Sequence, residues 1–158
     1  MGLFGKRTTE SEWLREFSPA VNQCSKLKSE ASDVLLTLST DISPMSLQLD
    51  KLRLVAQQIK RLPSPTSSVA ARAKRGYDSM LSAEIDKLQV QAQMMVYVNG
   101  HRQQSVINLR ERRPSSLTSG ELNRAEKMAA EKGRLEETIL EKKWDIRDYF
   151  GDNNLPLD

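Results

Sequence analysis

Apolar side chains recur along residues 14–42 at alternating steps of three and four positions, the repeat of a helix with one buried face. The stripe is interrupted by one lysine and consists of Leu14, Phe17, Val21, Cys24, Lys28, Ala31, Leu35, Leu38 and Ile42. Because an α-helix turns once in about 3.6 residues, this spacing places all of these side chains on one narrow face. The pattern predicts a helix that packs side by side with another helix.

The start of this segment is open to two interpretations. Thr9 and Glu12 form a capping-box pattern, so we expect a short first helix to begin near Glu10. Pro19 then either ends that helix or kinks one continuous helix. The apolar stripe stays in register through Phe17, which favours a kink or a very short break.

Three further segments carry apolar residues at helical spacing. Their stripes are Leu52, Val55, Ile59 and Leu62; Ala73, Tyr77, Leu81, Ile85, Leu88, Ala92 and Met95; and Ala125, Met128, Leu135, Ile139, Ile146 and Tyr149. The Ser-Pro pairs at 43–44 and 64–65, and a second capping box at Thr118 and Glu121, are typical of helix starts. Gly151 is placed to cap the last helix.

The third of these helices is unusually long if it continues to Leu109. It would then reach roughly 67 Å, more than twice the length of the second helix. Its stripe turns polar at Asn99 and Arg102, and Asn99 and Gly100 both tolerate left-handed backbone geometry. The sequence therefore slightly favours a helix break there. A β-hairpin is disfavoured because the residues after Gly100 do not alternate.

These patterns predict an all-α fold, namely an antiparallel, coiled-coil-like helical bundle of four long helices plus a short N-terminal helix. The length of 158 residues suits one domain. We assign residues 1–8 to a flexible N-terminus, 9–151 to a single bundle domain and 152–158 to a flexible C-terminal tail.

Composition agrees with helices that are washed by solvent, since aromatic residues make up 5% and charged residues 28% of the chain. The single cysteine, Cys24, cannot form an intramolecular disulfide, which favours a reducing, cytoplasmic location. The longest apolar run, 94–98, is far shorter than the roughly 20 residues of a membrane span. Leu3 and Phe4 beside two cations make only a weak anchor for a membrane surface.

Candidate catalytic groups are few. His101 is the only histidine, so the Glu-x-x-His pairs that build di-iron bundle sites cannot form. The sequence has no Gly-x-Ser-x-Gly elbow and no complete phosphate-binding loop. Cys24 lies on the apolar stripe, where a small buried thiol is typical. We therefore expect no enzymatic activity, no cofactor and no metal site.

Charge is distributed unevenly along the chain. Residues 51–113 carry a net charge of +8, whereas 1–50 carry −2 and 114–158 carry −3. In one interpretation, the acidic outer helices neutralise the basic central pair. In the other, the basic segment binds nucleic acid, acidic lipid or an acidic protein. The candidate residues are Arg72, Lys74, Arg75, Tyr77, His101, Arg102, Arg110, Arg112 and Arg113.

Two functional hypotheses follow from the sequence. The first is a non-enzymatic interaction or adaptor protein that binds a protein partner, or a second copy of itself, through exposed helix faces. The second is an electrostatic nucleic-acid-binding protein that uses the basic segment. It predicts that replacing Arg110, Arg112 and Arg113 together weakens oligonucleotide binding and flattens its salt dependence.

Overall fold

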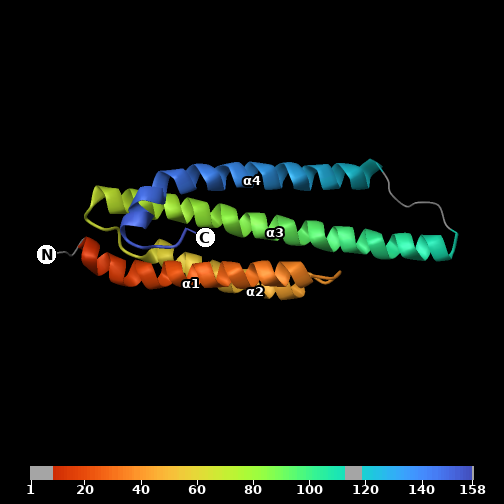
Figure 1. The fold of residues 1–158 in the computed structure, drawn as a ribbon, viewed down its shortest axis with the longest axis horizontal. Coiled ribbons are helices and arrows are strands. Elements are labelled where there is room, and N and C mark those ends of the chain that lie inside the picture. Colours follow the sequence, from red (N-terminus) through yellow and green to blue (C-terminus); the bar gives the residue numbers. More distant parts are fainter. Residues whose placement is uncertain (1–8, 113–118, 158) are drawn as a thin grey trace.

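The computed structural model describes residues 9–112 and 119–157 and contains four helices in that part of the chain (Figure 1). They are α1 (Glu10–Thr37), α2 (Ser43–Arg61), α3 (Ser68–Arg110) and α4 (Ser119–Asp152). Successive helices run in opposite directions, and the described residues form no β-strand. The predicted all-α antiparallel bundle is confirmed.

The expected short N-terminal helix is not a separate element. Thr9 caps α1 by accepting a hydrogen bond from the Glu12 amide at 3.3 Å, as the capping box predicts, and the helix then continues through Pro19 to Thr37. Proline deprives the helix of one backbone hydrogen bond. The helix persists because Phe17 and Val21, on either side of Pro19, are both fully buried on the same face.

An aromatic cluster closes one end of the bundle and joins α1, α3 and α4. The ring of Phe17 lies 4.3 Å from Trp13, 5.7 Å from Tyr77 and 6.0 Å from Phe150, centroid to centroid. The Tyr149 hydroxyl donates a 3.0 Å hydrogen bond to the Glu10 carboxylate. Because stacked and edge-on aromatic pairs stabilise beyond their buried area, this cluster fixes how the ends of the three helices meet.

The helix break expected at Asn99 and Gly100 does not occur, because α3 runs through both residues. The Asn99 side-chain amide instead donates hydrogen bonds to the backbone carbonyls of Leu38, at 2.8 Å, and Ser39, at 2.9 Å. Asn99 therefore satisfies carbonyl groups where α1 ends and the chain turns towards α2. The polar side chain of Asn99 therefore connects α3 to the end of α1 and does not interrupt α3.

Helix α3 extends well beyond the α1–α2 pair, and α4 follows it over much of that distance (Figure 1). A small second cluster of Ala83, Val90 and Leu135, flanked by Met94, Met128 and Ile139, connects the two helices. The two helices pack tightly at Gly76, where an added Cβ would lie 2.5 Å from Cγ2 of Ile146.

The last described residues fold back onto the bundle instead of leaving it. Gly151 lies within α4, and the left-handed position is Asn154, with φ of 54°. The Leu155 amide donates a 2.8 Å hydrogen bond to the Phe150 carbonyl, and the Leu155 side chain is buried. The segment that we assigned to a flexible tail thus contributes an apolar side chain to the core at residue 155.

Within residues 9–112 and 119–157, none of the helices combines the length and the apolar character needed to cross a bilayer.

Candidate functional site

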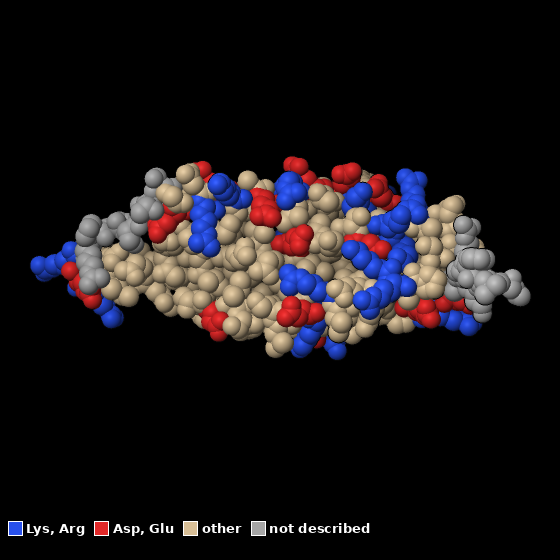
Figure 2. Space-filling model, turned by 180° about the vertical axis from the view of Figure 1, so that it is seen from behind, with Lys and Arg blue, Asp and Glu red and all other residues tan. Residues whose placement is uncertain are grey.

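The basic residues predicted from the sequence do not form one surface. Arg72 and Arg75 are exposed near the start of α3, whereas Arg110 and Arg112 are exposed at and just beyond its end. At 1.5 Å per residue, the two groups are roughly 57 Å apart along the helix axis. Figure 2 shows Lys and Arg side chains gathered towards the end where α1 begins, with a smaller group at the opposite tip.

Two of these candidates are structural. Lys74 is buried, with Nζ 3.1 Å from the Asp78 carboxylate, and donates a 3.4 Å hydrogen bond to the Lys60 carbonyl near the end of α2. Burial raises the pKa of the Asp78 carboxyl above its usual range, although Lys74 opposes that shift. Tyr77 lies in the aromatic cluster, where burial raises the pKa of its hydroxyl. Neither side chain faces solvent, so neither is available to a nucleic acid.

His101 and Arg102 lie in the middle of the extended part of α3. The His101 ring packs edge-on against Tyr97, with centroids 4.4 Å apart, and the Tyr97 hydroxyl donates a 2.9 Å hydrogen bond to the Glu121 carbonyl of α4. Arg102 is exposed. Arg113 and the Thr118 half of the second capping box lie outside the described residues.

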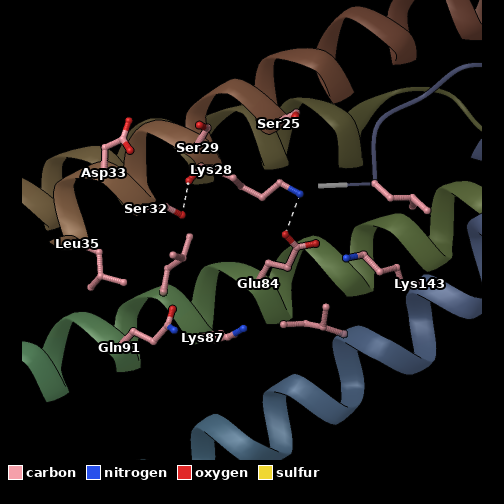
Figure 3. A pocket seen from close by; sticks show the side chains of 13 residues that line it. Ser25, Lys28, Ser29, Ser32, Asp33, Leu35, Glu84, Lys87, Gln91 and Lys143 are labelled. Carbon is pink, nitrogen blue, oxygen red and sulfur yellow. Dashed lines mark hydrogen bonds and ion pairs between the residues drawn. The ribbon is translucent and has the colours of Figure 1, made fainter.

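A polar cleft of about 650 Å³ opens between α1, α3 and α4 (Figure 3). Serine hydroxyls from α1 and lysines from α3 and α4 line it, together with Leu157 of the C-terminal segment. Its lining residues are Ser25, Lys28, Ser29, Ser32, Asp33, Leu35, Glu84, Lys87, Leu88, Gln91, Ile139, Lys143 and Leu157.

An ion pair lies at the base of this cleft. Lys28 Nζ of α1 is 2.8 Å from the Glu84 carboxylate of α3, and the two side chains are only 9% and 15% exposed. The lysine that interrupts the apolar stripe is thus matched by an acid on the neighbouring helix. The sequence gives no sign of this pairing, because Glu84 stands in a stretch with other charged residues and resembles a solvent-facing carboxylate.

Cys24, one turn before Lys28, is buried and unsuited to nucleophilic chemistry. Burial raises the pKa of its thiol to about 11, and the hydrogen bond that it shares with Tyr77 offsets only part of that rise. Since the thiolate is the reactive form, Cys24 stays protonated at neutral pH. In the described part of the chain, no group of His, Cys, Asp and Glu is arranged to hold a metal ion.

A second, more apolar groove of about 220 Å³ lies beside the cleft on the outer side of α4. Its lining residues are Leu140, Lys143, Trp144, Arg147 and Leu157, of which Lys143 and Leu157 also line the cleft. Leu140 and Trp144 are each 63% exposed. The Arg147 guanidinium lies 4.2 Å from the Trp144 ring centroid, in a cation–π contact.

This groove was not predicted from the sequence, because the apolar stripe that was identified there lies on the buried face of α4. Leu135 and Ile146 lie on that face and are buried, whereas Leu140, Trp144 and Arg147 form a parallel row at positions i, i+4 and i+7. Such a row can be found in a sequence by looking for large apolar residues that lie outside the buried stripe of a helix but recur at helical spacing.

No protein-family model matches the chain, no curated protein is significantly similar to it, and no solved structure matches its fold. The function must therefore be inferred from the residues themselves.

Proposed function

We propose that this protein is a non-enzymatic helical interaction module, an adaptor that binds a protein partner through an exposed helix face. The observation that carries the proposal is the row of Leu140 and Trp144 on α4, both more than half exposed beside a preformed apolar groove.

The α4 row differs from the other exposed apolar residues of the chain. Exposed leucines such as Leu47 and Leu54 on α2 are ordinary features of soluble proteins. The α4 row instead combines a tryptophan, an arginine stacked on its ring and a concave surface. Tryptophan and arginine in a pocket are the residues that contribute most to binding energy in protein interfaces.

The shape of α4 also suits a helical or extended partner. Positions i, i+4 and i+7 lie along one side of a helix, so a partner element can follow α4 over two turns. Leu157 of the C-terminal segment also lines the groove, which gives an apolar side chain of the partner a place to insert.

The proposal is tested by selecting peptides from a phage library of random helical sequences on the wild-type protein. The selected peptides are then tested for binding to a Leu140→Ser/Trp144→Ala variant that was absent from the selection. We expect peptides that bind the wild type and lose about thirtyfold or more in affinity for the variant, the loss typical of an interface hot spot. Leu54→Ser is the matched control, because Leu54 is 60% exposed on another helix. If no selected peptide distinguishes the wild type from the α4 variant, the proposal fails.

Nucleic-acid binding is the weaker alternative. Among the described candidates it relies on four exposed arginines spread along α3 and one just beyond its end, namely Arg72, Arg75, Arg102, Arg110 and Arg112. A salt-dependent rise in the fluorescence anisotropy of labelled oligonucleotides, lost in Arg72→Gln/Arg75→Gln, would favour it.

A further inference from the structure

The polar side chains of the α4 groove all carry positive charge. Leu140, Trp144 and Leu157 supply its apolar lining, and Lys143 and Arg147 supply its charged lining. A partner that covers this groove removes water from these two cations. Carboxylates of the partner would offset the free-energy cost of that desolvation.

Lys143 has no hydrogen bond or ion pair with any residue that the structure describes. It is half-buried, and its side chain reaches from α4 into the neighbouring cleft, as Figure 3 shows. Among the described residues, Arg147 forms an ion pair with Asp148, at 3.7 Å, but both side chains are more than half exposed, so this ion pair stabilises little.

The other lysines of the adjoining cleft already face acids. Lys28 is paired with Glu84 at 2.8 Å, and Lys87 lies 3.7 Å from Glu136. Lys143, which lines both the cleft and the groove, is thus a cation without an acidic partner among the described residues. Arg147 has only the weak, exposed ion pair with Asp148 and can pair with a further carboxylate. The two positions lie four residues apart, one helical turn, which matches the spacing of successive residues on one face of a partner helix.

We infer that the α4 groove binds an acidic amphipathic helix, whose apolar side chains cover Leu140, Trp144 and Leu157 and whose carboxylates pair with Lys143 and Arg147. This inference rests on the proposed function and specifies the class of its partner. The cation–π contact holds the Arg147 guanidinium over the indole ring, beside the apolar surface, where a flanking carboxylate of the partner can reach it.

The inference is tested with a second phage library of helical peptides. The apolar stripe of each peptide is fixed as leucine, and the flanking positions are drawn equally from Glu, Lys, Gln and Ser. We expect selection on the wild type to enrich Glu by about two- to fivefold at each paired position, the range of a solvent-exposed ion pair. Peptides that still bind Lys143→Gln/Arg147→Gln through the apolar stripe should show no enrichment of Glu. Lys51→Gln/Arg61→Gln, which removes two exposed cations from α2, is the matched control and should leave the enrichment unchanged.

Three outcomes overturn the inference, and they differ in what they imply for the proposed function. Peptides that require Trp144 but show no Glu enrichment refute the acidic partner and leave the interaction module standing. The absence of any Trp144-dependent peptide refutes both. A dimer in light scattering that Leu140→Ser/Trp144→Ala converts to a monomer would assign the groove to a second copy of the chain.

Discussion

Lys28 is the one cation in the apolar stripe of α1, and it is buried against Glu84 of α3. The stripe alone predicts that Lys28 faces another helix. The sequence could not predict that its partner is Glu84. Several acids stand on the other helices, and which of them faces Lys28 depends on how α1 and α3 are aligned. The ion pair requires the alignment of α1 and α3 that places Lys28 opposite Glu84.

Removing one member of this pair should cost more than removing both. We expect Lys28→Met to lower the free energy of unfolding by about 3 kcal/mol, because the carboxylate of Glu84 is left buried without its cation. Lys28→Met/Glu84→Leu should recover most of that loss, and Lys26→Met, on the exposed side of α1, should change it by less than about 0.5 kcal/mol. Urea unfolding measures all three variants. A double variant as unstable as Lys28→Met would show that the unpaired carboxylate of Glu84 is not the cause of the loss.

Gly76 is a second residue whose role is visible only in three dimensions. Alanine at this position would place its methyl group 2.5 Å from Cγ2 of Ile146, which is 1% exposed and cannot turn aside. We expect Gly76→Ala to lower the free energy of unfolding by about 1–2 kcal/mol, although alanine favours helix formation.

Gly100→Ala and Gly133→Ala are matched controls for this substitution. Both glycines lie inside helices, and an added methyl group meets no described atom within 4 Å. These two variants should therefore gain about 0.5–1 kcal/mol of stability from helix propensity. Thermal unfolding of the three alanine variants separates the effects, and equal stabilisation by all three would disprove the close approach at Gly76.

At the scale of the elements, apolar spacing predicted the helices better than it predicted their ends. The Ser-Pro pair at 43–44 correctly marked the start of α2. The helix break predicted at Asn99 and Gly100 was wrong. That prediction used only the tolerance of these residues for left-handed geometry, whereas Asn99 binds carbonyls where α1 ends. That contact joins residues about 60 positions apart, so it could not be predicted from the residues around Asn99.

The distribution of buried residues along α3 predicts a gradient of stability. Buried side chains are frequent up to Ala92, and beyond it Asn108 is the one described side chain of α3 that is buried. We expect native-state hydrogen exchange to be faster for the amides of residues 100–110 than for those of residues 77–92, because local opening there exposes little apolar surface. Uniform protection along the whole of α3 would show that the two parts unfold together.

At the scale of the whole molecule, residues that are close together in the basic segment of the sequence have different places in the fold. Arg72 and Arg110 belong to one basic segment, yet they lie near opposite ends of a single helix. Lys74, the neighbour of Arg72 in that segment, serves the packing of α2 on α3. The fold class could be predicted from spacing, whereas the groove on α4 required the C-terminal segment to fold back and bring Leu157 beside Trp144.

The central claim is that the exposed row on α4 is a binding surface. Its most direct test is a calorimetric titration of wild type, Leu140→Ser/Trp144→Ala and Leu54→Ser with a helical peptide selected on the wild type. We predict that the α4 variant loses about thirtyfold or more in affinity, with an unchanged circular dichroism spectrum, and that Leu54→Ser binds like the wild type. Equal affinity of the wild type and the α4 variant for that peptide would contradict the claim.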